Sequence, residues 1–495
     1  MSLQLYNTLT RKKAPLVARR GNAISLYVCG VTVWDSSHIG HARAAIVFDL
    51  LARYLRHQQF AVTYARNYTD VDDKIINRAN QEGVSWKTIA EKYIAEYAAD
   101  LARLGNITPD IEPKASDHIP QMITAIEQLI ARDMAYAVHG DVYFAVRKFP
   151  GYGKLSGKKI EELEVGARVE ANEAKRDPLD FALWKAAKPG EPAWSSPWGE
   201  GRPGWHIECS VMSAQHLGLP VDIHGGGRDL IFPHHENEIA QAEGLGVPEF
   251  ACCWMHNGSL TINDEKMSKS LGNYLKISDA LEKYDVETLR YFLLASHYRS
   301  PLDFTEQAIT DSERALSRVY EMSARLTPVP TTCVPEPVAP EGNAFDVARE
   351  AMHAVKQFPL LMRDALDDDL NTPKLFAAVF DVVRVLNRYL DSPGAQWEPA
   401  RLWIAAQWDE HRTALKQITG IFGSPPAAYI ARMAARATQA GGIDAAAVDK
   451  LLDERNLARK NRDFKRADEI RDQLAAMNIV IKDRPDGTTG WKVER

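Results

Sequence analysis

Short apolar runs and apolar residues at helical spacing alternate along the N-terminal part of the chain. Residues 25–29, Ser-Leu-Tyr-Val-Cys, are β-branched and aromatic and predict a buried strand. Behind this run, apolar side chains recur at the spacing of one helix face: Val47, Leu50, Leu51 and Tyr54. The stretch therefore predicts a strand followed by a helix that packs on it.

The same alternation continues downstream, with a second strand predicted at 61–68 and a helix at 86–104. Strands that alternate with helices form a parallel sheet with covered faces. We therefore expect an α/β chain with a Rossmann-like parallel-sheet catalytic domain. Nucleotides bind such sheets at the carboxyl ends of the strands.

The pattern divides the chain further. Between about 116 and 201 it loosens into a helix at 119–135, a strand at 141–146 and turn-rich segments, which indicates an insertion. Two proline- or glycine-rich linkers follow, at 327–342 and 420–426. The expected domains are a catalytic domain at 1–115 and 202–312, a connective insertion at 116–201, a helical bundle at 313–425, and a small mixed α/β domain at 426–495.

Composition narrows the class of protein. The 495 residues are 45% hydrophobic and 25% charged, which is typical of a folded protein with several domains. A net charge of −6 argues against a general nucleic-acid coating protein but allows a local basic face. No apolar run has the length of a membrane span, and we expect a cytoplasmic protein without a signal peptide. Five cysteines favour metal binding in a reducing compartment over a disulfide framework.

The motif His38-Ile39-Gly40-His41 lies between the first strand and its helix. A helix N-terminus offers unpaired N–H groups and a positive dipole end to phosphate. Gly40 has no side chain to hold a nucleotide away, so the motif predicts an ATP cradle. Two surface histidines at a helix start are the alternative when the motif is taken alone.

A second motif lies far downstream, at Glu265-Lys266-Met267-Ser268-Lys269-Ser270. Two lysines in a small polar segment suit a mobile loop that closes over a triphosphate, since an ammonium group can follow phosphate charge. A solvated loop is the alternative for a lysine run alone. The two motifs together resemble those of class I aminoacyl-tRNA synthetases.

Polar residues in two other regions suit the same sheet edge. Residues 67–74 follow the second strand and can place Thr69 and several carboxylates there, although a capped polar turn fits equally well. Glycines at 225–227 allow close backbone approach, and Asp229 can accept a hydrogen bond from ribose or an amino group. On a helix that starts after Pro233, His234 and Glu238 share a face and can hold one ion.

Cys29, Cys209, His234 and Glu238 form a set of the softness that zinc prefers, although buried core cysteines are the alternative on spacing alone. Longer motifs favour metal binding over buried core cysteines. Cys29-Gly30, the GWHIECS run at 204–210, DIHGGGRDLIFPHHENE at 222–238 and EKMSKSLGN at 265–273 resemble the cysteinyl-tRNA synthetase family. The resemblance implies that these four residues bind one Zn²⁺ per chain and that the zinc binds the thiol of the amino acid.

The resemblance also implies the reaction and its other residues. ATP, with Mg²⁺, activates L-cysteine to cysteinyl-adenylate, and the aminoacyl group passes to the 3′ end of cysteine tRNA. The implied catalytic residues are His38, His41, Lys266 and Lys269, which bind ATP together with Gly40 and Asp229. The implied walls of the amino-acid pocket are Thr69, Trp205 and His206. Family members are usually monomers, so a monomer is expected.

The clearest basic cluster lies near the C-terminus, where the family reads the anticodon: Arg455, Arg459, Lys460, Arg462, Lys465 and Arg466. Phe464 and Trp491 are candidate stacking surfaces for unpaired bases. Interspersed acidic residues leave a solvated helix face as the alternative. Two rival functions are a cysteine ligase that acts on an amino-sugar thiol precursor and a zinc-stabilised RNA-binding protein without catalysis.

Overall fold

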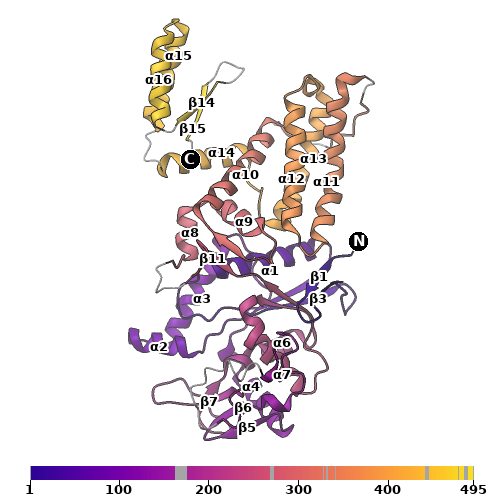
Figure 1. Ribbon diagram of the computed structural model, residues 1–495, viewed down its shortest axis with the longest axis vertical. Helices are drawn as coiled ribbons and strands as arrows, with labels where there is room; N and C mark the ends of the chain where they lie inside the picture. Colours follow the sequence, from indigo (N-terminus) through magenta and orange to yellow (C-terminus); the bar gives the residue numbers. More distant parts are fainter. Residues whose placement is uncertain are drawn as a thin grey trace. The chain divides into compact units, whose positions relative to one another are not determined.

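Two structural units divide the chain in the computed structural model (Figure 1). The first unit comprises Met1–Thr305, Gln357–Val379 and Ala414–Ile421, and the second comprises Glu306–Lys356, Phe380–Thr413 and Phe422–Arg495. The structure describes residues 2–161, 175–267, 273–326, 328–330, 333–339, 342–440, 445–477, 479–483 and 489–493.

A four-stranded parallel sheet in the order β10-β9-β3-β4 forms the centre of the first unit. Its strands are β3 (Ala23–Val28), β4 (Ala61–Arg66), β9 (Val221–Gly227) and β10 (Ala251–Asn257). Helix α1 (Ile39–His57) lies on one side of this sheet, and α6 (Trp205–Leu217) and α7 (Glu236–Gly244) lie on the other (Figure 1). The predicted α/β parallel-sheet fold is therefore confirmed.

Local sequence explains where the flanking helices begin. His38 caps α1, and its side chain accepts a hydrogen bond from the backbone N–H of Gly40. Helix α3 (Trp86–Arg103) is capped by Ser85, close to the predicted bounds. Helix α2 (Asp73–Glu82) was not predicted; Asp72 caps it by accepting from the N–H of Lys74 at 2.9 Å. The polar stretch after the second strand is thus a capped helix start.

The insertion contains an antiparallel sheet in the order β5-β6-β7-β8, next to α4 (Ile119–Ala131). Its strands are β5 (Ala135–Val138), β6 (Asp141–Phe144), β7 (Phe181–Ala186) and β8 (Gly201–Pro203). The predicted helix at 119–135 ends early because β5 and β6 form a hairpin. His139 and Gly140 make its turn with positive φ angles of 53° and 89°, a conformation that two-residue hairpin turns need.

The remaining elements of the first unit surround the sheet. They are β1 (Gln4–Asn7), β2 (Lys12–Pro15), η1 (Ala115–His118), η3 (Arg228–Leu230), η4 (Ile231–His235), β11 (Leu260–Ile262), β12 (Glu265–Lys266), α8 (Ile277–Lys283), α9 (Val286–Ala295) and β13 (Leu302–Phe304). A buried ion pair joins α1 to α9: Oδ2 of Asp49 lies 2.5 Å from Nη2 of Arg290. Arg290 also donates to two backbone carbonyls, so its charge is fully bonded.

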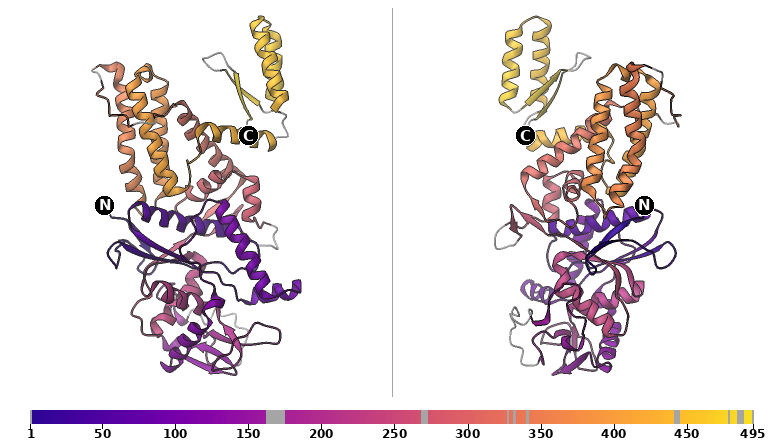
Figure 2. Two further views of the ribbon diagram at one scale, coloured as in Figure 1. Left: turned by 180° about the vertical axis from the view of Figure 1, so that it is seen from behind. Right: turned by 45° about the vertical axis from the view of Figure 1, so that its right-hand side comes forward.

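The second unit is helical and ends in a small mixed α/β part. Its helices include α10 (Glu306–Arg325), α14 (Pro426–Ala440), α15 (Ala445–Lys460) and α16 (Phe464–Ala476), while α11 (Asp346–Leu366), α12 (Thr372–Leu390) and α13 (Glu398–Thr419) contribute to both units. Helices α15 and α16 pack together beside the hairpin of β14 (Ile479–Asp483) and β15 (Thr489–Val493) (Figure 2). The predicted turn at 485–487 lies outside the described residues.

Within the described part of the chain, every helix is too short or too polar to pass through a lipid bilayer. The domain boundaries drawn from the sequence stay predictions. Tyr429 on α14 stacks on Tyr320 of α10 with 3.9 Å between ring centroids, so α14 packs with the helical bundle inside the second unit.

Candidate active site and metal centre

The two histidines of the first motif form a stacked pair at the start of α1. Their ring centroids lie 3.7 Å apart. Nδ1 of His38 accepts from the N–H of Gly40 at 3.1 Å, and Nδ1 of His41 accepts from the N–H of His38 at 3.2 Å. Because both Nδ1 atoms act as acceptors, the ring proton of each neutral imidazole lies on Nε2, where it is a donor.

Burial keeps both rings uncharged at neutral pH. Burial lowers the pKa of His38 to about 4, partly offset by the charge of Asp229. It lowers the pKa of His41 to about 3, with the neighbouring His38 adding to the effect. The motif therefore presents two neutral Nε2–H donors at the positive end of the helix dipole, which suits phosphate oxygens. The N–H groups of Ile39, Gly40 and His41, which the sequence predicted to be unpaired, are already hydrogen-bonded within the protein.

The second motif lies against the first. A Cβ on Gly40 would lie 2.9 Å from the ring of His38 and 3.0 Å from Cε of Met267, so the missing side chain makes room for both. After the motif, the N–H of Ile39 donates to the carbonyl of Leu275, and the hydroxyl of Tyr274 donates to the carbonyl of Ser36 at 2.6 Å. Met267 therefore lies next to the start of α1, and Tyr274 and Leu275 are hydrogen-bonded to it.

The two predicted lysines differ in what the structure describes. Lys266 is exposed on β12, where its backbone pairs with Thr261 of β11. Lys269 and its neighbours from 268 to 272 lie outside the described residues. Asp229 lies on η3, exposed and close enough to the histidine pair for its charge to act on His38.

The four predicted metal ligands converge at the edge of the sheet. Donor atoms of Cys29, Cys209, His234 and Glu238 all lie within 4.8 Å of one another. The thiol of Cys29 lies 3.3 Å from Oε1 of Glu238, and Nε2 of His234 lies 2.9 Å from the same oxygen. Helix α7 begins at Glu236, later than predicted, because the chain is extended at Phe232, but His234 still reaches Glu238.

Burial and neighbouring groups shift the pKa values within this group in opposite directions. Burial raises the pKa of the Cys209 thiol, but hydrogen bonds with Cys29 and His234 outweigh it and lower that pKa to about 6. Burial lowers the pKa of His234, but the carboxylate of Glu238 raises it by more, to a net value of about 10. Two thiols, an imidazole and a carboxylate in a buried pocket are a donor set that fits a divalent ion of intermediate softness.

Asn67 holds this group together and was not identified from the sequence as a site residue. Its side-chain oxygen accepts from the N–H of Gly30 at 2.9 Å and lies 3.6 Å from the thiol of Cys209. A Cβ on Gly30 would overlap the carbonyl oxygen of Asn67. Glycine after Cys29 is therefore required for the ends of β3 and β4 to approach each other.

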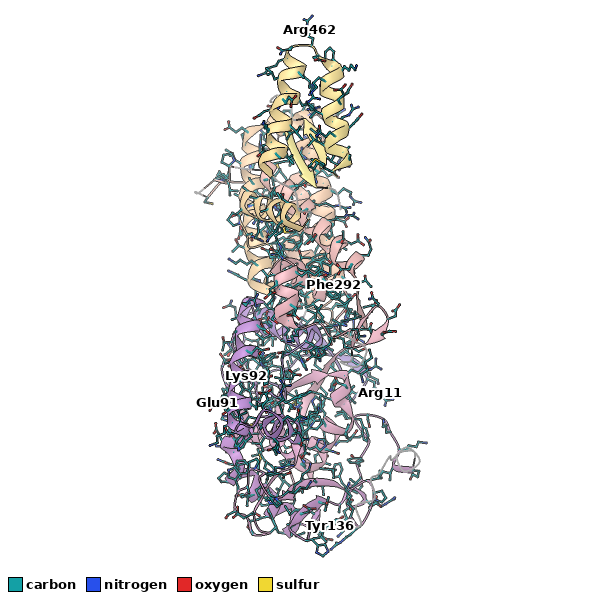
Figure 3. The ribbon with its side chains drawn as sticks, turned by 90° about the vertical axis from the view of Figure 1, so that its left-hand side faces the viewer. Arg11, Glu91, Lys92, Tyr136, Phe292 and Arg462 are labelled. Carbon is teal, nitrogen blue, oxygen red and sulfur yellow. The ribbon has the colours of Figure 1, made fainter. Side chains whose placement is uncertain are left out.

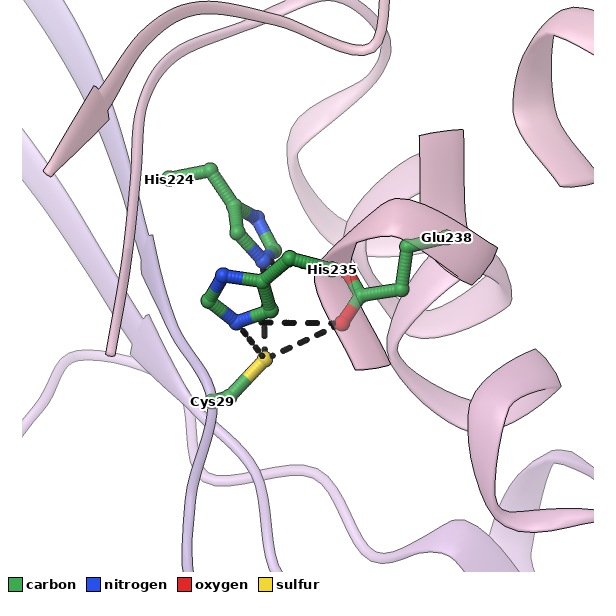
Figure 4. A group of neighbouring side chains, drawn as sticks. All are labelled: Cys29, His224, His235 and Glu238. Carbon is green, nitrogen blue, oxygen red and sulfur yellow. Dashed lines mark hydrogen bonds and ion pairs between the residues drawn. The ribbon is translucent and has the colours of Figure 1, made fainter. Parts of the chain in front are cut away.

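Two further histidines, His224 and His235, were also missed. Their Nε2 atoms, with donor atoms of Cys29 and Glu238, form a second group within 4.8 Å (Figure 4). His224 lies on β9 and His235 on η4, the two elements that carry the glycine run and His234. The adjacent histidines at 234 and 235 were the available sequence signal.

Two of the three predicted pocket residues adjoin the metal ligands. The ring of Trp205 stacks on His234 with 4.2 Å between centroids and is 37% exposed, so it separates the ligands from solvent. Nδ1 of His206 lies 3.0 Å from Nδ1 of His234. Thr69 is buried, and its hydroxyl donates to Oε2 of Glu208 at 2.7 Å, next to Cys209 in the chain.

The basic cluster of the C-terminal part lies on α15, on α16 and in the turn between them. Arg462 marks that turn (Figure 3). Arg466 is partly neutralised by Glu454, with 2.7 Å between Nη2 and Oε1. Phe464 is 63% exposed, as a base-stacking surface requires. The side chain of Trp491 lies outside the described side chains.

Three family descriptions match the chain. Residues 15–314 match "tRNA synthetases class I (C) catalytic domain", residues 362–423 match "DALR domain", and residues 445–490 match "Cysteinyl-tRNA ligase anticodon binding domain". The catalytic match covers both motifs and all four predicted metal ligands.

Curated relatives match along the whole chain. A cysteine–tRNA ligase of Geobacter sulfurreducens is 51% identical over 495 residues, covering 100% of both chains. One of Nitratidesulfovibrio vulgaris (strain Miyazaki F) is 52% identical, covering 99% of this chain and 100% of the relative. Among solved structures, methionyl-tRNA synthetase of Mycobacterium tuberculosis in complex with methionyl-adenylate has a TM-score of 0.60 at 16% identity, covering 82% of this chain and 93% of that chain. The last likeness concerns the fold alone.

We predict that Gly30→Ala weakens metal retention. The added methyl group would overlap the carbonyl of Asn67, so the ends of β3 and β4 must separate and move Cys29 away from the other donors. Overpacking of this kind costs at least about 1–3 kcal/mol in folding free energy. Metal content after dialysis and the denaturation midpoint measure both effects. A variant with the metal content and stability of the wild type would contradict the geometric role of Gly30.

Proposed function

The chain belongs to the cysteine–tRNA ligase family of class I aminoacyl-tRNA synthetases, and we propose that it attaches L-cysteine to cysteine tRNA in an ATP-dependent reaction. The observation that carries this proposal is identity of about half of all residues over the full length of cysteine–tRNA ligases. The juxtaposed histidine pair and thiol-containing donor set support it chemically.

The proposed reaction has two steps. A carboxylate oxygen of cysteine attacks the α-phosphorus of ATP, which forms cysteinyl-adenylate and releases pyrophosphate. A terminal hydroxyl of the tRNA then attacks the acyl carbon, and AMP leaves. Mg²⁺ accompanies ATP as its counterion. Positioning and charge stabilisation supply the rate, since neither step needs a covalent enzyme intermediate.

We assign the phosphate contacts to His38, His41, Lys266 and Lys269. The two neutral rings would donate from Nε2 to phosphate oxygens, and the lysines would neutralise charge that develops on the departing pyrophosphate. Gly40 leaves space for the nucleotide, and Asp229 would accept a hydrogen bond from its ribose or adenine amino group.

We assign one zinc ion to Cys29, Cys209, His234 and Glu238. When bound, zinc offers a soft position that a substrate thiolate fills readily and a serine hydroxyl fills poorly. Trp205 and His206 would bound this position on the side of His234 and exclude water from it. Thr69, oriented by Glu208, would face the polar end of the amino acid.

We assign anticodon reading to the C-terminal residues that match the anticodon-binding family, with the basic turn and exposed Phe464 as contacts for unpaired bases. That match argues against the rival ligase for an amino-sugar substrate, which needs no anticodon-reading end. Action in the cytoplasm, a monomeric state and the four-part domain division remain part of this proposal.

We predict that the variants His38→Asn and His38→Ala distinguish two roles of His38, namely capping of α1 through Nδ1 and hydrogen-bond donation to phosphate from Nε2. Asparagine still accepts from the N–H of Gly40, so its stability should stay near the wild type, whereas alanine should lose about 1 kcal/mol. Both lack the Nε2–H group, and both should slow single-turnover adenylate formation by about 100-fold. An asparagine variant with the wild-type adenylation rate would remove His38 from the chemistry.

We predict that deletion of residues 441–495 preserves cysteine-dependent exchange of pyrophosphate into ATP but strongly reduces tRNA charging. The deletion starts after α14 because Tyr429 packs on Tyr320, and its loss would disturb the helical bundle. Exchange and charging are measured on the same preparation. Charging at the wild-type rate by the shortened chain would refute anticodon reading by this part.

We predict that the cobalt-substituted protein shows a thiolate-to-metal absorption band that intensifies with cysteine and does not change with serine. The added substrate thiolate would become a further sulfur ligand, whereas the hydroxyl of serine would not. A spectrum that is unchanged at saturating cysteine would refute recognition of the thiol by the metal, even if the metal is required for folding.

A further inference from the structure

We propose that Cys29 and Glu238 form, with His224 and His235, a second metal position that is exclusive with the one completed by Cys209 and His234. We call the Cys209–His234 group the outer set and the His224–His235 group the inner set. The inference rests on the proposed function only for the identity of the metal as zinc. Cys29 and Glu238 would thus bind the metal either with the outer pair or with the inner pair.

The separations within the inner set fit one tetrahedral ion. The thiol of Cys29 lies 3.3 Å from Nε2 of His235, 3.5 Å from Nε2 of His224 and 3.3 Å from Oε1 of Glu238. Nε2 of His235 lies 3.9 Å from the same carboxylate oxygen, and Nε2 of His224 lies 3.0 Å from the other oxygen, Oε2. Tetrahedral zinc with bonds of about 2.0–2.3 Å places neighbouring donors about 3.3–3.6 Å apart. Small side-chain adjustments therefore complete the site.

The imidazoles of the inner set are oriented by their surroundings. Nδ1 of His235 is hydrogen-bonded to Nε2 of His256 at 2.8 Å, and Nδ1 of His256 is bonded to Oγ1 of Thr8 at 2.8 Å. A chain of this kind fixes the ring and directs Nε2 to the metal position. The ring of His224 stacks on Tyr27 at 5.3 Å, which directs its Nε2 to the same point.

Charge favours one ion at a time. The two sets together offer three anionic donors, namely the thiolates of Cys29 and Cys209 and the carboxylate of Glu238. Two divalent ions would share the thiolate of Cys29 and the carboxylate of Glu238, and they would repel each other in a pocket where Glu238 and both inner histidines are fully buried. A single ion uses both shared donors without this repulsion. Occupation of one set therefore empties the other.

The sets differ in access to substrate. Trp205, which is 37% exposed, covers the outer set through its stack on His234. The inner set is enclosed by buried rings, with Phe250 and Trp254 at 4.9 and 4.7 Å from His224. In the inner set, a metal would therefore be held by the protein and would not bind a substrate thiol.

The test uses the full-length variant Cys209→Ser/His234→Gln loaded with cobalt. After dialysis it should retain one equivalent of cobalt and show a thiolate band of about half the wild-type intensity, because one thiolate remains of two. This band should not respond to cysteine. Adding His224→Gln and His235→Gln to that variant should abolish cobalt binding, whereas the matched control His216→Gln, a histidine paired with His118 elsewhere in the unit, should not.

Three results would overturn the proposal. They are a folded double variant that binds no cobalt, a double variant whose band still intensifies with cysteine, and a wild-type protein that binds two equivalents. If the double variant does not fold, His234→Gln alone must show retained cobalt and a band that is silent to cysteine. The wild-type response to cysteine tests the proposed function separately, since it depends on the outer set.

Discussion

The parallel register of β3 with its two neighbours is the constraint on which the site depends. Val28 pairs with Arg66 of β4 and with Gly225 of β9, so all three strands reach the same edge together. Whatever follows each strand must then share a small space. Cys29 and Asn67 meet there because Gly30 lets the two backbones touch. Cys209 on α6 and Glu238 on α7, two of the proposed metal ligands, approach from the helical layer. A shift of one strand by two residues would keep its buried face and destroy the site.

The histidines at this edge of the sheet differ in protonation state. At the start of α1, burial outweighs the charge of Asp229 and keeps His38 and His41 neutral, and their Nδ1 atoms accept hydrogen bonds from backbone N–H groups. In the proposed metal centre, burial lowers the pKa of His234, but the carboxylate of Glu238 more than offsets this, so the ring holds a second proton until a cation replaces it. The balance between burial and neighbouring charge therefore decides which imidazoles are charged.

The sequence predicts β3, β4, the positions of α1 and α3, and the convergence of two cysteines with His234 and Glu238, because each has a local pattern or a family motif. It does not predict what depends on tertiary distance. In the sequence Asn67 resembles an ordinary turn residue, and only the fold brings the N–H of Gly30 within hydrogen-bonding distance of its side chain. His224 lies within β9 and resembles a core histidine, and only the pairing of β9 with β3 directs it toward Cys29. The early end of α4 likewise depends on a hairpin that no helix pattern reveals.

The anchoring of the lysine segment has a consequence for how the chain can change over generations. Met267 lies against Gly40, and Tyr274 is bonded to Ser36, so the intervening stretch spans two fixed points. Point substitutions there alter one side chain at a time and can be selected individually. A gained or lost codon moves every later residue of the stretch relative to the helix start at once. We therefore expect the length of this segment to be constrained as strictly as its lysines, whereas surface loops without such anchors tolerate changes in length.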